Sequence, residues 1–142
     1  MRYIPASLRK LVIERADNRC EYCGLSQGGQ AATFHIDHVI PVAAGGPTTG
    51  ENLALACVSC SLRKAARQTA TDLETDQKAP IYNPRSQFWH DHFRWDDMRV
   101  GGVTAVGRAT VAALEMKRPM ILDIRAEEEL FGRHPPPSGR PS

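Results

Sequence analysis

Apolar and polar residues follow helical or strand periodicity over much of the chain. Residues 6–15 carry apolar side chains at helical spacing and predict a helix. The apolar stripe of this helix consists of Leu8, Leu11 and Val12. Residues 33–40 alternate polar with β-branched or aromatic side chains and predict a strand. Gly45, Gly46 and Pro47 then break the chain, and a basic helix is expected to start near Cys60.

The second half is predicted to be mainly helical after a segment rich in aromatic residues. The aromatic side chains gather between residues 81 and 95. Residues 98–103 predict a short strand, and Thr104 is a suitable N-cap for the helix that follows. Pro119 fits the first turn of another helix, over residues 120–130.

Composition and charge narrow the function classes only a little. The chain is 42% hydrophobic and 24% charged, as in an ordinary soluble protein. No apolar run approaches the roughly 20 residues of a membrane helix, and residues 1–5 lack the apolar stretch of a signal peptide. We therefore expect a cytoplasmic protein without a membrane partner. The formal net charge is +2, and residues 1–70 hold 8 Lys and Arg against 5 Asp and Glu, which agrees with phosphate binding there.

Four cysteines form two identical pairs, Cys20-x-x-Cys23 and Cys57-x-x-Cys60. In a cytoplasmic chain such pairs indicate metal or redox chemistry rather than disulfides. Two pairs complete a tetrahedral zinc shell with no open position, which is typical of a structural site. The alternatives are two unrelated pairs or a redox dithiol, which normally follows a strand in a βαβ unit. We predict a structural Zn²⁺ held by the four thiolates.

An adjacent carboxylate and imidazole lie between the two cysteine pairs, at Asp37 and His38. A carboxylate can hold a divalent cation that neutralises charge on a phosphodiester, and an imidazole can take a proton from water at neutral pH. Because neighbouring side chains in a strand point to opposite faces, both can serve one site only if the strand bends or ends there. His35 shares the face of Asp37 and is either a metal partner or a structural histidine.

The surrounding motif resembles the HNH endonuclease family. The residues that carry the resemblance are, in order, Asp37-His38-x-Ile40-Pro41, Gly45-Gly46, Glu51-Asn52-Leu53-x-Leu55, Cys57-x-x-Cys60 and Lys64. They fall within residues 20–64. The resemblance implies an α+β fold whose core is a ββα-metal unit, a hairpin and a helix around one divalent cation, Mg²⁺ or Mn²⁺.

The resemblance also implies a role for each residue of the motif. His38 is the general base, Asp37 is a metal ligand, and Asn52 braces the loop between the strands so that the base is positioned. The third letter of the motif, normally Asn or His and a metal ligand, is Ser61 in this chain. Serine supplies a hard oxygen but is shorter than asparagine, so the metal site is expected to be weaker.

The implied function is a metal-dependent endonuclease that hydrolyses phosphodiester bonds in DNA. Basic residues after the second cysteine pair are candidates for backbone contacts, with a solvated helix face as the alternative: Arg63, Lys64 and Arg67. The competing functions are a zinc-stapled DNA-binding module that has lost catalysis, which Ser61 favours, and a thiol-switch protein. The sequence leaves the oligomeric state open.

The C-terminal half resembles the extension of a bacterial subgroup of short HNH proteins. The matching motifs are Asn83-Pro84-Arg85, Trp89-x-x-His92-Phe93-x-Trp95 and Gly102-x-Thr104-x-x-Gly107-Arg108. Core packing is the favoured interpretation of Trp89 and Trp95 over stacking on bases. Arg85 and Arg108 are interpreted either as phosphate contacts or as ion-paired residues, and His90 and His92 as remote candidates for the metal.

The expected organisation follows from these elements and from the composition between them. A polar, charged stretch followed by Pro80 indicates a linker, and three consecutive prolines near the C-terminus indicate disorder. The expected units are an HNH core with the zinc site at 1–70, a linker at 71–79, a C-terminal α/β extension packed on the core at 80–131, and a disordered tail at 132–142.

Overall fold

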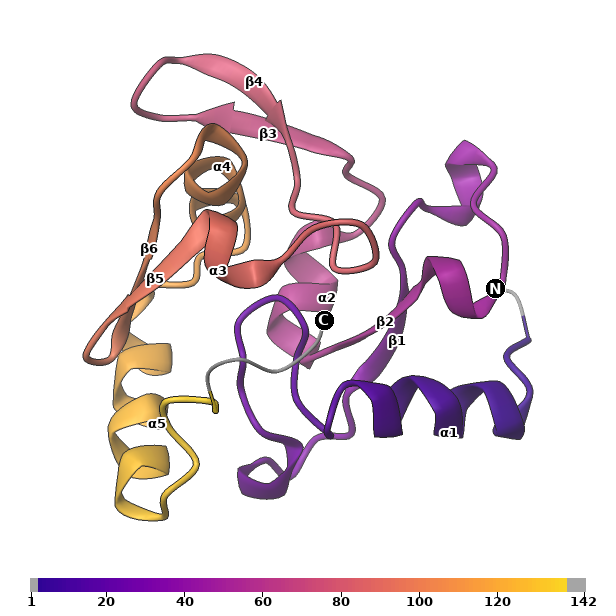
Figure 1. The fold of residues 1–142 in the computed structure, drawn as a ribbon, viewed down its shortest axis with the longest axis horizontal. Helices are drawn as coiled ribbons and strands as arrows, with labels where there is room; N and C mark the ends of the chain where they lie inside the picture. The colour runs from indigo at the N-terminus through magenta and orange to yellow at the C-terminus, as the bar shows by residue number, and fades with distance from the viewer. Residues whose placement is uncertain (1–2, 138–142) are drawn as a thin grey trace.

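The computed structural model describes residues 3–137 and has a mixed α+β fold (Figure 1). The helices are α1 (Ala6–Arg15), α2 (Val58–Lys64), α3 (Trp89–His92), α4 (Ala105–Ala113) and α5 (Pro119–Leu130). The strands are β1 (His35–His38), β2 (Leu53–Ala56), β3 (Thr69–Asp72), β4 (Gln77–Pro80), β5 (Phe93–Asp96) and β6 (Arg99–Gly102). Short 3-10 turns lie at η1 (Gln27–Gly29), η2 (Val42–Ala44) and η3 (Gly50–Asn52).

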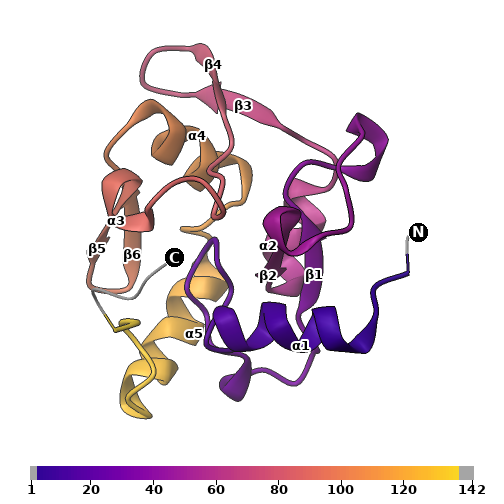
Figure 2. The same ribbon diagram turned by 45° about the vertical axis from the view of Figure 1, so that its right-hand side comes forward.

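The strands of the described residues form three separate antiparallel hairpins rather than one sheet. In the first, β1 pairs with β2, so that His38 lies opposite Leu53. Helix α2 follows β2 directly and packs against both strands, which completes a ββα unit. Figures 1 and 2 both show α2 between this hairpin and the C-terminal elements. The strand predicted over 33–40 is shorter at both ends in the structure and covers His35–His38.

Helix α1 has the bounds that the hydrophobic pattern predicted. Its apolar face is narrower than expected, since Val12 is fully buried whereas Leu11 is half exposed. The helix ends where Asp17 and Asn18 adopt φ values of 55° and 57°, a left-handed conformation that short polar side chains tolerate. Arg15 in its last turn donates hydrogen bonds to two backbone carbonyls of the η3–β2 segment and ties α1 to the hairpin.

The segment expected as a linker, residues 71–79, is instead most of the β3–β4 hairpin. Small apolar side chains on one face of this hairpin, Ala70 and Ala79, pack against Ala109 of α4. The other face is polar and exposed, which is why the composition indicated a linker. Two alanines bury too little surface to produce a recognisable strand pattern.

The C-terminal helices follow the predicted start signals. The side chain of Thr104 accepts a hydrogen bond from the backbone N–H of Gly107 and caps α4. Pro119 occupies the first turn of α5. Leu114 and Ile121 reach the main core. Among residues 3–137, no helix combines the length and the apolar character that a membrane crossing requires.

The described part of the expected disordered tail packs against the protein. His134 is buried and lies edge-on to the ring of Trp95, with Nε2 2.8 Å from the carbonyl oxygen of Asp97. An aromatic contact and a hydrogen bond therefore hold the segment 132–137, which the proline content alone did not predict. The last five residues of the chain lie outside the described range.

Candidate active site and metal centre

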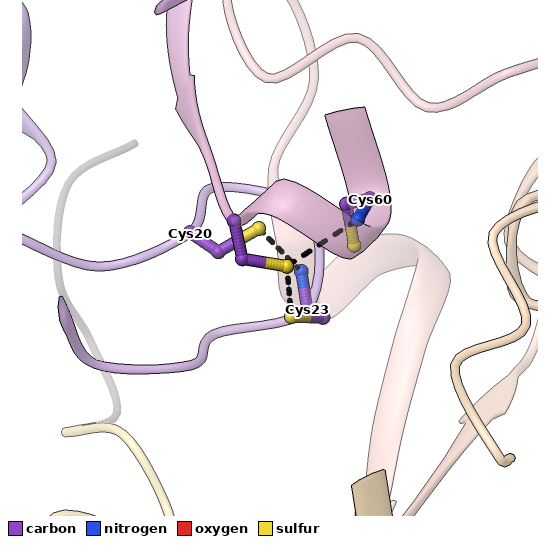
Figure 3. A group of neighbouring side chains, drawn as sticks. Cys20, Cys23 and Cys60 are labelled. Carbon is purple, nitrogen blue, oxygen red and sulfur yellow. Dashed lines mark hydrogen bonds between the residues drawn. The ribbon is translucent and has the colours of Figure 1, made fainter. Parts of the chain in front are cut away.

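Four buried thiols meet between the start of α2 and the loop after α1. The sulfur atoms of Cys20, Cys23, Cys57 and Cys60 all lie within 4.8 Å of one another. In Figure 3 the labelled sulfurs of Cys20, Cys23 and Cys60 point toward one another. Such a closed set of four sulfur donors suits a structural zinc ion, because zinc binds thiolates tetrahedrally.

Local backbone geometry presents the thiols in pairs. The amide of Cys23 points at the sulfur of Cys20 at 3.5 Å, and the amide of Cys60 points at the sulfur of Cys57 at 3.4 Å. Gly24 closes the first turn with a φ of 79°, which favours glycine. Hydrogen bonds from the other cysteines lower the pKa of Cys23, whereas burial raises the pKa of Cys20. A metal ion that binds here would displace protons from the thiols.

Asp37 lies on the face of β1 that is turned toward α2. Its Oδ2 accepts hydrogen bonds from the Tyr22 hydroxyl at 2.8 Å and from the Lys64 ammonium at 3.1 Å. Burial raises the pKa of Asp37, while the ammonium and the hydroxyl act in the opposite direction. Both partners contact Oδ2, so Oδ1 is the oxygen of Asp37 that would bind an ion.

Lys64 does not lie where a phosphate contact requires it. Its residue surface is 1% exposed, and its ammonium also donates to the carbonyl oxygen of His38 at 3.1 Å. The prediction that it binds nucleic acid is therefore corrected: Lys64 joins α2 to β1 from the inside. The sequence pattern could not show this, because a lysine on a short helix is normally solvated.

The other predicted basic contacts are placed differently. Arg63 bonds the carboxylate of Glu115 at 2.9 Å and is one-third exposed. Arg67 is exposed, but it lies beyond the end of α2 rather than on that helix. The remaining candidate arginines are ion-paired, Arg85 with Glu21 and Arg108 with Asp72.

His38 is the last residue of β1 and follows Asp37 directly in the chain. Its Nε2 lies 2.9 Å from the hydroxyl oxygen of Thr48, in the loop between the two strands. The strand ends at this residue, as a site shared with Asp37 requires. Thr48 orients the imidazole, and a hydroxyl can do so for either tautomer because it both donates and accepts.

Asn52 holds the loop that follows His38. Its side-chain oxygen accepts from the amide of Ile40 at 2.8 Å, and its side-chain nitrogen donates to the carbonyls of Ile40 and Pro47 at 3.0 and 2.9 Å. Gly46 allows this close packing, since a Cβ there would lie 1.7 Å from the carbonyl oxygen of Ile40. These are the contacts of a residue that braces the loop between the strands.

Ser61 lies across from His35, with its hydroxyl 2.8 Å from Nδ1 of the imidazole. Carboxylate, hydroxyl and water oxygens form the donor set that Mg²⁺ and Mn²⁺ prefer, so Asp37 and Ser61 fit such an ion by chemistry. Within residues 3–137, only the four cysteines form a cluster of at least three His, Cys, Asp or Glu ligands. His92 is bonded to Thr104 and does not join this site.

Sequence reasoning missed two residues that orient the motif, Thr48 and Tyr22. Thr48 is one of several polar residues in a glycine-rich loop, so nothing in its local sequence marks it. Tyr22 sits inside the first cysteine pair, and only the fold brings it to Asp37. The pairing of Lys64 with Asp37 was missed for the same reason.

The ββα unit carries a histidine at the end of its first strand and a thiol cluster at the start of its helix. Residues 20–67 match the family model described as HNH endonuclease, so the chain contains an HNH domain. An HNH domain indicates nuclease activity on a nucleic acid. No curated protein matches the chain.

Proposed function

We propose that this protein is a metal-dependent endonuclease that hydrolyses phosphodiester bonds in DNA. The observation that carries the proposal is the support around His38. Thr48 holds its ring, and Asn52 braces the loop beside it, at the end of the strand that also bears Asp37. An oriented imidazole next to a carboxylate supplies the two groups that general-base hydrolysis of a phosphodiester requires.

In the proposed mechanism His38 accepts a proton from the attacking water. Thr48 keeps the ring in the orientation for this transfer, and the geometry of the loop depends on Asn52. Asp37 and Ser61 would hold Mg²⁺ or Mn²⁺, which when bound neutralises charge on the phosphate and the leaving oxygen. Lys64 and Tyr22 keep the Asp37 carboxylate in place on its strand.

We assign the four thiolates a structural role in this mechanism. Their zinc ion would join the loop after α1 to the first turn of α2, the helix that carries Ser61 and Lys64. With α2 held in place, its side chains that face β1 are held in place as well. Arg67 is the exposed basic residue closest in sequence to this helix, and it is our candidate for a backbone phosphate contact.

The test is cleavage of supercoiled plasmid DNA with Mg²⁺ or Mn²⁺ by the wild type and by His38→Ala. Removing a general base should slow cleavage by at least about 100-fold. His90→Ala is the matched control, because His90 is an exposed histidine on α3, and it should cleave at the wild-type rate. Cleavage by His38→Ala at that rate would refute the assignment.

A DNA-binding module without catalysis is the second candidate. The ion pair between Lys64 and Asp37 favours it, because an ammonium already balances the carboxylate that would hold the catalytic ion. Ser61 in place of Asn or His points the same way. This candidate is supported if the wild type retards DNA in a gel but leaves plasmid intact under every metal tried.

A further inference from the structure

A cleft of about 280 Å³ lies between the HNH domain and residues 80–87 of the C-terminal extension. The two residues that follow His38 form part of one wall, and the extension forms the other. Lys64 also lines the cleft, and its ammonium contacts both Oδ2 of Asp37 and the carbonyl oxygen of His38. Lys64 thus connects the cleft to the candidate active site, and the proposed mechanism assigns the cleft no task.

The lining of the cleft suits a flat ligand that accepts hydrogen bonds. No Asp or Glu is found among the described residues that line it, whereas Lys64 and Arg67 are cationic. Arg67 is exposed, and its guanidinium forms no hydrogen bond or ion pair within residues 3–137. Apolar side chains on both walls, among them Ile40 and Ile81, can cover the faces of a base. A nucleotide combines such a base with an anionic phosphate.

The turn at residues 83–87 orients two side-chain amides that line the cleft. The side-chain oxygen of Asn83 accepts from the backbone amide of Arg85 at 2.8 Å, and that of Gln87 accepts from the backbone amide of Asn83 at 2.9 Å. Because a backbone N–H can only donate, the atom that it faces on each side chain is the oxygen. Both NH₂ groups are left over, and neither has a hydrogen-bond partner in the described part of the chain.

Donors of this kind distinguish bases by their exocyclic groups. Guanine and thymine carry a carbonyl oxygen, which accepts a hydrogen bond, where adenine and cytosine carry an amino group, which donates one. An amino group placed against an NH₂ donor leaves both donors unsatisfied. Gln68 and Ser86 also line the cleft, but their exposed side chains can donate or accept and therefore do not discriminate.

The size of the cleft limits what can enter it. Its volume of about 280 Å³ is just below the roughly 300–1,000 Å³ of sites for drug-sized ligands. A cleft of this size suits a single base rather than a base pair, so the base that enters it must be unpaired. Enzymes that act on such a base hold it by contacts to its edge and its faces.

We propose that this cleft binds one unpaired base of a nucleic-acid strand and prefers a base with a carbonyl group facing Asn83 and Gln87. Guanine, thymine and uracil meet this requirement. Arg67 contacts the phosphate of the same nucleotide. The inference rests on the proposed function, because a base held here brings the adjoining phosphates of its strand to the side of His38 and Asp37. The extension thereby helps to select where a strand is cut.

The experiment measures the binding of two fluorescein-labelled single strands of equal length, oligo-deoxyuridine and oligo-deoxycytidine. Their bases are alike in size, but uracil has a carbonyl oxygen where cytosine has an amino group. Fluorescence anisotropy gives both Kd values without added Mg²⁺ or Mn²⁺, so that neither strand is cut. The wild type should bind oligo-deoxyuridine about 5–10-fold more tightly, at the low end of discrimination by contacts to a base edge. Equal affinities, or no binding of either strand, would overturn the proposal.

Two variants remove the donors with little change in shape. Asn83→Asp and Gln87→Glu replace each NH₂ by an oxygen and keep the oxygen that accepts from the backbone. Each should lower the ratio of the two affinities, and the double variant should abolish or reverse the preference. Repulsion of the strands by the added charge cancels in the ratio. Gln77→Glu is the matched control, because it adds the same charge on an exposed residue of β4 outside the cleft, and it should keep the wild-type ratio. A double variant with the wild-type ratio would refute the role of the two amides.

The phosphate contact is tested separately with Arg67→Met. This variant should weaken the binding of both strands equally and reduce the slope of log affinity against log salt by about 0.7, the effect of losing one phosphate contact on a single strand. An unchanged slope would contradict the contact.

Plasmid cleavage separates this inference from the proposed function. A protein that shows the base preference but leaves plasmid intact under every metal tried supports the cleft and refutes the endonuclease. A protein that cuts plasmid but binds both strands equally refutes the cleft alone.

Discussion

The two ends of the ββα unit differ in how their candidate metal ligands are paired. At the start of α2, four buried thiols face one another, and no carboxylate or ammonium pairs with them among the described residues. One turn further along, the only buried carboxylate of β1 is already paired with Lys64. The first end therefore offers an ion four donors that have no charged partner among the described residues. At the second end the carboxylate already has a cationic partner.

This difference has a direct physical cause. Neutral thiols can be buried without penalty and become a strong ligand set once a metal displaces their protons. A carboxylate cannot be buried alone, because its desolvation is too unfavourable. Asp37 therefore needs the Tyr22 hydroxyl and the Lys64 ammonium before any metal arrives. The predictions that follow test this contrast, from the largest expected effect to the smallest.

Cys57→Ser should remove the folded state at ordinary temperature. A structural zinc site contributes about 10–16 kcal/mol of apparent binding free energy, which is folding free energy when the site closes only in the folded chain. Thermal unfolding of the variant, and of the wild type after strong chelation, should show the same loss. Purified wild type that contains no zinc by elemental analysis, and whose thiols react freely while it is folded, would contradict this.

Lys64→Met should destabilise the protein by about 3–5 kcal/mol, because it leaves the Asp37 carboxylate buried without its cation. Urea unfolding measures the change, and Lys78→Met on the exposed side of β4 is the matched control. Millimolar Mn²⁺ should restore part of the stability of Lys64→Met and change the wild type little. If Mn²⁺ has the same effect on both proteins, Asp37 does not hold the ion.

Ser61→Asn should increase cleavage at limiting Mn²⁺, and Ser61→Ala should decrease it. One oxygen ligand or hydrogen bond contributes roughly 0.5–1.5 kcal/mol, so the metal midpoint should move by about two- to tenfold. Ser59→Ala is the control in the same helix, since its hydroxyl bonds Arg63 instead. Identical titration curves for all of these proteins would exclude position 61 as a ligand.

Asp72→Asn should make the thermal stability of the protein depend less on pH under acidic conditions. The bond from Arg108 holds the pKa of Asp72 at about 2, against about 3.9 for an unfolded aspartate. The stabilisation is thus present above about pH 4 and is lost as the pH falls toward 2. Thermal unfolding of the wild type across that window should drop more steeply than that of the variant. Asp76→Asn, an exposed position in the same hairpin, should follow the wild type.

The clustering of the four thiols and the starts of the last two helices could be predicted because their signals are local. Two cysteines three positions apart reach one ion from a single turn. Thr104 and Pro119 act on the first turn of their own helices. The local sequence did not predict the β3–β4 hairpin, because its buried face is made of alanines and it is supported by packing against α4.

The sequence by itself determined that this chain carries an HNH motif with a closed set of four thiols. Tertiary structure decided what each charged group of the motif does. Tyr22 reaches Asp37 across 15 positions of sequence, Lys64 turns inward to pair with the same carboxylate, and Arg125 of α5 donates to the backbone carbonyls of Met98 and Met116. Burial and pairing of charges depend on which distant segments pack together, and no periodicity within a segment encodes that.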